Sequence, residues 1–139
     1  MSSAGPGTSR RYNRPFVLAY VDVRGLKQVN DTEGHLAGDQ LLKGVSSMLQ
    51  DSARADDVVG RLGGDELGLL LPEQTLTGAA IATQRIHSHV RAHRDEIGIT
   101  TPWDLTIGTA AYPEDGESVD DLLAAADRRL YEQRGISLR

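Results

Sequence analysis

The sequence predicts an α/β fold of the α+β kind, in which one central sheet is flanked by helices. Three observations predict it: a continuous apolar, β-rich run near the start, two short β-like runs joined across a pair of glycines, and helical apolar periodicity in the segments between the strands. The elements follow in the order β-α-α-β-β-α-β-α. At 139 residues, 39% hydrophobic and 25% charged, the chain has the length and composition of one globular domain.

The first strand is expected close to the N-terminus. Residues 1–14 are rich in Ser, Gly, Pro and Arg without periodicity, which is typical of a disordered tail, so the folded domain is expected over residues 15–139. Residues 16–23 are apolar on both faces, which indicates a central strand that is covered on each side. Its one carboxylate, Asp22, lies where the strand ends.

Two helical segments should follow this strand. Residues 25–29 are predicted to form one helical turn, followed by a loop that contains Gly34 and Gly38. An amphipathic helix should then begin at Asp39. Its apolar positions are Leu41, Leu42, Val45, Met48 and Leu49.

A hairpin is predicted next, because the β-like runs 58–62 and 66–71 flank Gly63-Gly64. Two adjacent glycines favour the positive φ angles of a tight turn. The remaining elements are a helix, a strand over residues 103–112 and a last helix. Their predicted core positions are Leu76, Ala79, Ala80, Thr83, Ile86 and Val90, then Leu105, Ile107, Thr109 and Ala111, then Val119, Leu122, Leu123, Ala126 and Leu130.

Composition excludes several classes of function. Lys+Arg 15 against Asp+Glu 20 gives a net charge of −5, and few aromatic residues are present, so the chain lacks the features of a nucleic-acid binder. The absence of cysteine excludes disulfides, thiolate metal sites and a cysteine nucleophile. No segment is apolar over the ~20 residues that a membrane span needs, and no secretory signal is evident, so we expect a cytoplasmic protein.

Three carboxylates should converge at one end of the sheet. Asp65 and Glu66 directly follow the paired glycines of the hairpin, and this hairpin is the natural neighbour of the strand that ends at Asp22. Clustered carboxylate oxygens are what Mg²⁺ requires when it also holds substrate phosphates. The alternative is that Asp65 and Glu66 are solvated turn residues.

A wider set of motifs accompanies these acids in a fixed order. Gly63-Gly64-Asp65-Glu66-Leu67 resembles the signature of the GGDEF family of diguanylate cyclases. The resemblance extends from Phe16 to Tyr131. Its other motifs are Asp22-Val-Arg-Gly-Leu-Lys27-Gln-Val-Asn30-Asp31, Gly34-His35, Gly38-Asp39, Arg54-x-x-Asp57, Thr106-Ile-Gly108, Tyr112-Pro-x-Asp-Gly116 and Ala126-Asp127-x-x-Leu-Tyr131.

The resemblance implies a fold and a reaction. The fold is a ferredoxin-like palm of the nucleotidyl cyclase kind, with a central, mostly antiparallel sheet. In this family two protomers, each holding one GTP, condense the two nucleotides into cyclic di-GMP and release two pyrophosphates. The resemblance therefore implies a homodimer and Mg²⁺ or Mn²⁺ as cofactor.

The same resemblance assigns metal and phosphate positions. Asp22, the Val23 carbonyl, Asp65 and Glu66 fall on the metal positions, and Asp65, Glu66 and Lys27 are the implied catalytic residues. The backbone amides of Gly25 and Leu26, with the charge of Lys27, would bind phosphates at a helix start. Taken alone, a lysine such as Lys27 is more often a solvated surface residue. Arg134 falls on a lysine position of the family near the C-terminus.

Asn30, His35 and Asp39 fall on the family's substrate positions. Guanine presents N1–H and its exocyclic amino group as paired donors, for which a carboxylate such as Asp39 is a double acceptor, while Asn30 can donate and accept at the base edge. Two alternatives remain open. Aspartate is also a favoured helix N-cap residue, which would account for Asp39. Asn30 and Asp31 are also residue types that are common where a helix ends.

Arg54 and Asp57 match the family's R-x-x-D inhibitory site, where product binds away from the catalytic centre. The pattern also describes a common surface ion pair. His89 and His93 are spaced for a metal-binding pair, but they lie off the apolar stripe of their helix, and a solvated helix face accounts for them.

The chain departs from the family pattern at a few positions. Arg24 stands where a second aspartate is frequent, and Leu26 and Leu67 replace phenylalanines on a buried side. A later phosphate-contacting arginine has no clean match. The usual N-terminal D-x-L-T-G-L-x-N-R segment is missing, so a further sensory domain is expected outside this chain.

Two rival functions remain open. The first is a catalytically silent GGDEF module that binds GTP or cyclic di-GMP and signals through a partner. The second is a nucleotide cyclase that uses ATP, which Asp39 disfavours.

Overall fold

The computed structural model describes the backbone of residues 14–137 and the side chains of residues 14–132. The predicted tail therefore lies outside the described residues except for Arg14, whose guanidinium is 3.2 Å from the Glu73 carboxylate. The predicted order of elements is confirmed, with one additional short 3₁₀ helix, η1. The elements are β1 (Phe16–Arg24), α2 (Leu26–Glu33), α3 (His35–Ser52), β2 (Val58–Arg61), β3 (Glu66–Pro72), α4 (Leu76–His93), η1 (Arg94–Ile97), β4 (Asp104–Tyr112) and α5 (Val119–Ser137).

The sheet confirms the predicted fold class. Its four strands lie in the order β2-β3-β1-β4, and every neighbouring pair is antiparallel. This order, with helices connecting β1 to β2 and β3 to β4, is the ferredoxin-like arrangement. The apolar run near the N-terminus becomes β1, which lies between β3 and β4 as expected for a strand covered on each side.

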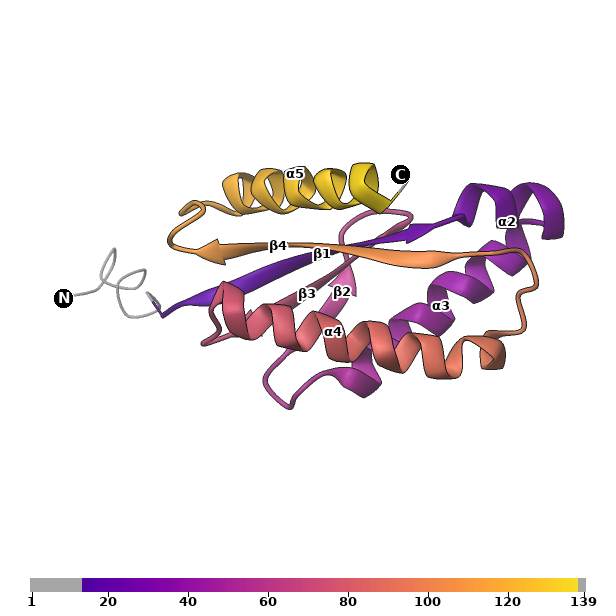
Figure 1. Cartoon of the computed structure of the whole chain (residues 1–139), viewed down its shortest axis with the longest axis horizontal. Helices are drawn as coiled ribbons and strands as arrows, with labels where there is room; N and C mark the ends of the chain where they lie inside the picture. Colours follow the sequence, from indigo (N-terminus) through magenta and orange to yellow (C-terminus); the bar gives the residue numbers. More distant parts are fainter. Residues whose placement is uncertain (1–13, 138–139) are drawn as a thin grey trace.

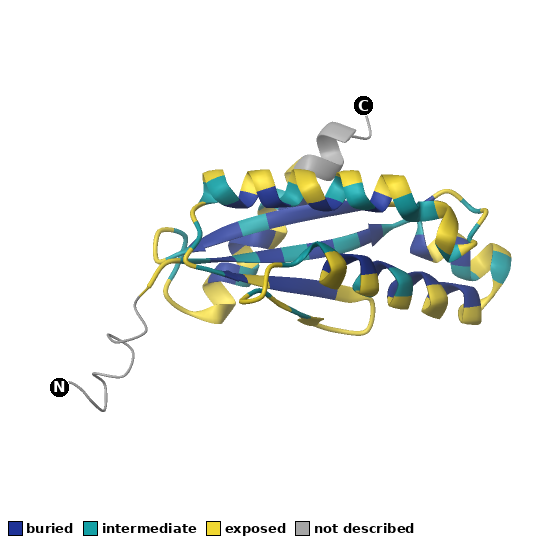
Figure 2. Cartoon of the chain, turned by 90° about the horizontal axis from the view of Figure 1, so that it is seen from below, coloured by how far each residue is buried: buried dark blue, intermediate teal, exposed yellow. Residues whose placement is uncertain are grey.

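Helices cover both faces of the sheet, α5 above it and α3 and α4 below it in the view of Figure 1. The side chains of β1 alternate between buried and half-buried positions. Figure 2 shows buried residues along the strands and the inner sides of the helices. On the lower face, Val17, Ala19 and Val21 are fully buried in the main core. On the upper face, Leu18 and Tyr20 pack against a smaller cluster that includes Leu122 and Ala126 of α5.

Two expectations about the helices after β1 are wrong. The predicted single turn is α2, a helix of 8 residues, because Leu26 and Val29 are buried against the core and packing extends the helix. The next helix begins at His35, so Gly34, with φ of 95°, takes the N-cap position that we assigned to Asp39 as an alternative. Asp39 lies inside α3 and caps nothing.

The apolar stripes of α4 and α5 are shifted from the prediction. In α4 the buried residues are Ala79, Ala82, Ile86 and Val90, while Ala80 is exposed. Steps of three, four and four residues keep one face toward the core, and Ala80 lies about 100° from that face. In α5, Ala125 is buried, whereas Val119 at the helix start is 68% exposed.

The hairpin between β2 and β3 is confirmed, but its turn differs from the prediction. Neither Gly63 nor Gly64 has a positive φ angle. The strands are joined by residues 62–65, and the Leu62 N–H donates to the Glu66 carbonyl at 2.8 Å. A loop of this length reverses the chain without the left-handed backbone of a two-residue turn.

Helix α5 is held to β4 by a close approach and an ion pair. Gly108 leaves room for the Ala126 carbonyl, which a Cβ at position 108 would overlap. Arg129 donates to both carboxylate oxygens of Asp115 at 2.7 and 2.8 Å, and to the Thr109 carbonyl at 2.8 Å. This hydrogen bonding lowers the pKa of Asp115. The helix therefore has a defined place above β1 and β4.

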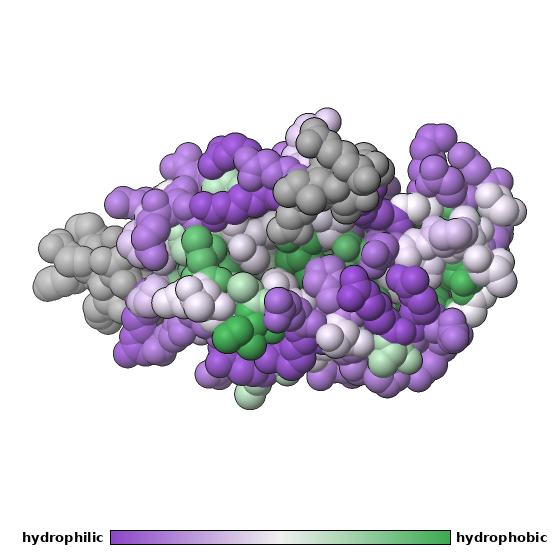
Figure 3. Space-filling model, in the orientation of Figure 1, coloured by the Kyte–Doolittle hydropathy of each residue, from purple (hydrophilic) through white to green (hydrophobic). Residues whose placement is uncertain are grey.

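The surface seen in Figure 3 is mostly hydrophilic, with apolar residues in small separate patches. Within residues 14–137, none of the helices has the length and apolar character that crossing a membrane requires.

Candidate active site

A pocket of ≈ 630 Å³ opens where β1 ends and α2 begins. Asp65 of the hairpin loop and His35 of α3 also line it, so the pocket joins four segments of the chain. Eight of the residues that the sequence singles out lie together here. They are Asp22, Val23, Gly25, Leu26, Lys27, Asn30, His35 and Asp65.

The turn from β1 into α2 leaves backbone N–H groups open at the start of the helix. Gly25 has φ of 92°, and a Cβ at this position would lie 2.5 Å from the Pro102 carbonyl oxygen, so the turn requires glycine. The first hydrogen bond of the helix runs from Val29 N–H to Gly25 O, at 2.9 Å. The N–H groups of Leu26, Lys27 and Gln28 therefore have no partner within the helix, and Gly25 at the N-cap has no side chain to cap them. Such a helix start attracts phosphate.

Oxygen donors gather beside this turn. Asp22 pairs with Glu66 at the last position of the β1–β3 ladder, whereas the β1–β4 ladder continues to Arg24. Beyond Asp22 the ladder with β3 therefore ends, while the ladder with β4 continues. Val23 lines the pocket at this point, although its residue is only 4% exposed.

These donors fit a divalent metal in part. Among the described residues, no three His, Asp or Glu side chains lie close enough to form a preassembled metal cluster. Two carboxylate residues, Asp22 and Asp65, line the pocket together with Val23. Mg²⁺ is commonly bound by one or two carboxylates, with the remaining positions taken by water and substrate phosphates, so this donor set fits it.

Glu66 lies next to the pocket rather than in its lining. Its Oε1 is folded back over the turn, where a Cβ at Gly63 would lie 2.8 Å from that oxygen. Burial of the Tyr20 phenol and the nearby Glu66 carboxylate raise the pKa of Tyr20. The missing side chain at Gly63 thus leaves room for the Glu66 carboxylate.

Of the three predicted substrate residues, Asn30 and His35 line the pocket and Asp39 does not. The Asn30 side-chain oxygen lies against Gly38, at a place that any Cβ would overlap. This contact brings Asn30 beside the segment that carries Asp39. Asp39 itself is exposed and outside the pocket lining.

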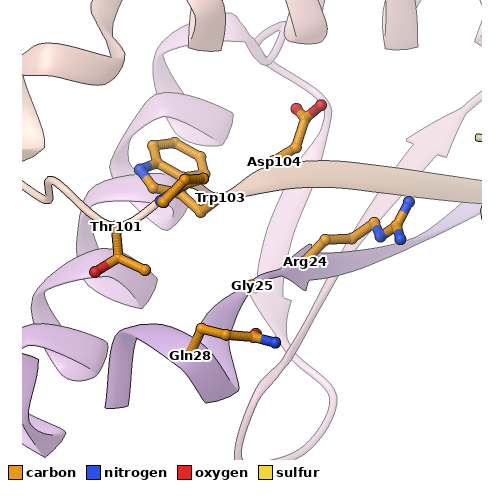
Figure 4. A pocket seen from close by; sticks show the side chains of 7 residues that line it. Arg24, Gly25, Gln28, Thr101, Trp103 and Asp104 are labelled. Atoms are coloured by element: carbon orange, nitrogen blue, oxygen red, sulfur yellow. The ribbon is translucent and has the colours of Figure 1, made fainter. Parts of the chain in front are cut away.

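Cationic side chains lie on both sides of the β1–α2 turn. Lys27 has an exposed side chain that forms an ion pair with Asp31 at 3.1 Å, as expected of a surface lysine. Lys27 also lines the pocket. Arg24 lines this pocket and a second one of ≈ 530 Å³ that includes Gln28 and Trp103. Figure 4 shows Arg24 and Gln28 extending in the same direction, away from Trp103.

Arg54 and Asp57 lie together after the end of α3, away from the pocket. Asp57 Oδ2 accepts from the Arg54 backbone N–H at 2.8 Å, and the two charged groups are 3.7 Å apart. The Asp57 side chain is only 2% exposed, and its Oδ1 has no hydrogen-bond partner among the described residues. Arg85 of α4 reaches the same region and donates to the Ser52 carbonyl at 3.1 Å.

His89 and His93 of α4 are less exposed than a solvated helix face implies. The His89 side chain is 28% exposed, and its ring centroid is 4.3 Å from that of His93. His89 Nε2 is 3.9 Å from an Asp51 carboxylate oxygen across the α3–α4 groove. These residues line a separate pocket of ≈ 390 Å³.

Some relevant residues escape sequence reasoning, and one expected residue cannot be placed. Gln28 has no signal that distinguishes it from a surface residue. Tyr20 could have been found, because strand alternation places it on the same face as Asp22. The side chain of Arg134 lies outside the described residues.

Comparison with known proteins gives a consistent result. Residues 7–136 match the family model described as "Diguanylate cyclase, GGDEF domain". The bifunctional diguanylate cyclase/cyclic di-GMP phosphodiesterase MucR of Pseudomonas aeruginosa is 37% identical over 87% of this chain, and the probable diguanylate cyclase DgcT of Escherichia coli is 32% identical over 86%. The matched regions amount to 18% and 27% of these relatives, so the chain spans only a fraction of their length.

Solved GGDEF domains share the fold. The GGDEF domain of YfiN (TpbB) from Pseudomonas aeruginosa superposes with a TM-score of 0.77 at 29% identity, covering 90% of this chain and 79% of that one. The GGDEF domain of DgcB from Caulobacter crescentus, solved in complex with cyclic di-GMP, gives 0.78 at 26% identity, covering 94% and 78%.

Proposed function

The chain belongs to the GGDEF family of diguanylate cyclase domains, and from that premise we propose that it condenses two GTP molecules into cyclic di-GMP. The observation that supports this most is the single pocket that gathers Asp22, Asp65 and the open start of α2. Carboxylates and free backbone amides in one pocket suit a nucleoside triphosphate that is bound with a divalent cation.

The reaction needs a nucleophile, an electrophile and a leaving group. The 3′-hydroxyl oxygen of one GTP bonds to the α-phosphorus of the other, the bond from that phosphorus to the pyrophosphate oxygen breaks, and the hydroxyl proton leaves. Asp65, on the exposed hairpin loop, is the proposed proton acceptor. Asp22, the Val23 carbonyl and Asp65, with Glu66 adjacent, would hold a Mg²⁺ or Mn²⁺ ion, which would neutralise charge on the phosphates.

Binding and orientation fall to the two helices after β1. The amides of Leu26 and Lys27 at the start of α2 hold the terminal phosphates, with Gly25 shaping the turn and the Lys27 charge nearby. Asn30, positioned by Gly38, and Asp39 on α3 face the guanine edge, and His35 shapes the pocket wall.

Assembly and regulation follow from one nucleotide per protomer. Two attacks require two facing half-sites, so the active species is a homodimer, and a reaction that consumes GTP is expected in the cytoplasm. Cyclic di-GMP binds at Arg54 and Asp57, where the exposed Arg54 guanidinium is the group that a phosphate or guanine meets, and inhibits without competing with GTP.

The test is product formation from GTP and Mg²⁺, analysed by nucleotide chromatography over a range of protein concentrations. The wild type should form cyclic di-GMP, with a rate per protomer that rises with concentration. Asp65→Ala should form none while keeping the circular dichroism spectrum of the wild type, and Asp120→Ala, at an exposed aspartate far from the pocket, should be active. A folded, dimeric wild type that binds GTP but forms no product would instead identify a nucleotide-binding module.

A further inference from the structure

The segment between η1 and β4 packs against the turn from β1 into α2. A Cβ at Gly25 would lie 2.5 Å from the Pro102 carbonyl oxygen and 3.2 Å from the Trp103 Cα, so the backbone of this segment lies directly against the backbone of the turn. Figure 4 shows Thr101 and Trp103 next to the turn at Gly25. We call residues 98–103 the backing segment, because it supports the turn at which the open N–H groups of α2 begin.

Glu33 holds the backing segment at the other end of α2. Glu33 is the last residue of this helix, and its Oε2 accepts a hydrogen bond from the Thr101 backbone N–H at 2.8 Å. The same oxygen accepts from the Thr101 hydroxyl and, at 3.4 Å, from the Thr100 hydroxyl. These hydrogen bonds lower the pKa of Glu33, so its carboxylate is charged at neutral pH.

The far end of the backing segment is anchored by Arg94 of η1. The Arg94 guanidinium donates to the Trp103 carbonyl at 2.7 Å and lies 3.6 Å from the Asp104 carboxylate. It also lies over the Trp103 ring, 4.7 Å from the ring centroid. The backing segment is therefore joined to η1 and to the start of β4 where it meets α2, and Glu33 attaches the helix to a fixed support.

Helix α2 is thus attached to the same support at both ends. Its start lies against Pro102 through Gly25, and its last residue, Glu33, is bonded to Thr101. The residues of α2 that line the candidate active site, Asn30 among them, lie between these two attachments. Because a helix moves as a unit, a tilt of α2 would displace its open N–H groups and Asn30 together.

We propose that Glu33 is a positioning residue for nucleotide binding, holding α2 in the orientation in which its open N–H groups and Asn30 meet the nucleotide. The proposal rests on the proposed function only in that the pocket at the start of α2 binds a nucleoside triphosphate. Glu33 is outside the lining of this pocket and acts through Thr101 and the orientation of the helix.

The test compares nucleotide affinity, not turnover, between the wild type and Glu33→Ala. Isothermal titration calorimetry with a non-hydrolysable GTP analogue and Mg²⁺ should show an affinity about tenfold lower for Glu33→Ala, the effect of losing one hydrogen bond to a charged group. Glu33→Gln keeps an oxygen that can accept from the Thr101 N–H and should recover most of this loss. The control is Glu73→Ala, which removes a glutamate that pairs with Arg14 at the opposite end of β1 and should bind as the wild type does.

A double-mutant cycle identifies the partner through which Glu33 acts. Thr101→Val removes one donor to the carboxylate and should lower the affinity less than Glu33→Ala does. In a Glu33→Ala background, Thr101→Val should produce no further loss, because the carboxylate that its hydroxyl contacts is gone. Thr101→Val is also the variant to measure if Glu33→Ala does not fold.

Hydrogen exchange gives a readout that a merely structural contact would not move. If nucleotide binding depends on the Glu33 contact, binding must stabilise that contact in return, because the coupling between two equilibria is reciprocal. The Thr101 amide should therefore exchange more slowly when the wild type binds the analogue, and should not respond to the analogue in Glu33→Ala. The Leu122 amide, which donates to the Ser118 carbonyl at the start of α5, is the internal reference.

Either of two results overturns the proposal. The first is a Glu33→Ala affinity equal to that of the wild type. The second is a loss of affinity without any effect of the analogue on Thr101 exchange in the wild type, which would make Glu33 a purely structural contact. A wild type that binds the analogue but makes no cyclic di-GMP contradicts the proposed function alone, whereas a wild type that binds no nucleotide contradicts both.

Discussion

The side-chain oxygen of Asn30 on α2 lies directly against Gly38 on α3, in space that any Cβ at position 38 would occupy. The two helices can therefore place a polar group at their contact only because residue 38 is glycine. Asn30 also lines the pocket at the end of β1. A glycine inside a helix thus has a role in the site, although it costs helix stability.

Gly38→Ala should weaken GTP binding without weakening the fold. The new methyl group displaces the flexible end of Asn30, which loses its place at the base edge, and we expect GTP affinity to fall about tenfold. Alanine is the better helix former by about 1 kcal/mol, so the melting temperature should stay the same or rise. Isothermal titration calorimetry and thermal unfolding measure both effects. Gly60→Ala is the control, since a Cβ there meets open space, and unchanged GTP affinity in Gly38→Ala would contradict the role of Asn30.

Asp39→Ala should relax the preference for GTP over ATP. Guanine offers two donors to this carboxylate, whereas adenine offers none at N1, so losing the acceptor should reduce the ratio of GTP to ATP affinity by about tenfold. Because Gly34 occupies the N-cap position, the melting temperature should stay within about 1 °C of the wild type. Asp51→Ala, an exposed aspartate at the other end of α3, is the control. An unaltered nucleotide preference would leave Asp39 as a surface residue.

Strand patterns were the most informative part of the sequence. The apolar run of β1 predicts an interior strand, because a strand that is covered on both faces is apolar throughout. Asp22 at the end of this strand and Asp65 in the hairpin loop predict where the pocket lies. Asp22 and Asp65 do line one pocket. Their meeting follows from antiparallel pairing, which local sequence anticipates well.

Features that depend on packing between distant segments were not predictable. The length of α2 is set by burial of Leu26 and Val29 against the core. The N-cap of α3 is Gly34, although Asp39, five residues later, is the residue type that usually occupies an N-cap. The pairing of Asp22 with Glu66 depends on strand register, which a single sequence does not specify.

Arg54→Ala should remove inhibition by cyclic di-GMP. The guanidinium lies 3.7 Å from the buried Asp57 carboxylate and is the exposed member of the pair, so it is the group that an incoming phosphate or guanine meets first. Progress curves with added cyclic di-GMP should slow for the wild type, with no change in the KM for GTP, and should not slow for Arg54→Ala. Arg91→Ala, at another exposed arginine, should remain sensitive. Equal inhibition of the wild type and Arg54→Ala would reduce the motif to a surface ion pair.

Asp115→Asn should destabilise the domain in a pH-dependent way. Arg129 donates to both oxygens of Asp115, and these hydrogen bonds lower the pKa of that carboxyl in the folded state. A carboxyl whose folded pKa is lowered stabilises the fold above its unfolded pKa of about 3.9, and the contribution disappears as the pH falls through the folded value. At pH 7 the free energy of unfolding of Asp115→Asn should therefore be lower than that of the wild type by about 2 kcal/mol, since the pair is partly buried. This difference should shrink toward zero below about pH 3.

Urea unfolding of both proteins from pH 7 to pH 2.5 measures this difference. The control is Asp120→Asn, on the exposed first turn of α5. A gap between wild type and Asp115→Asn that stays constant over this range would show that Arg129 holds α5 to β4 through the Thr109 carbonyl and not through the charge of Asp115.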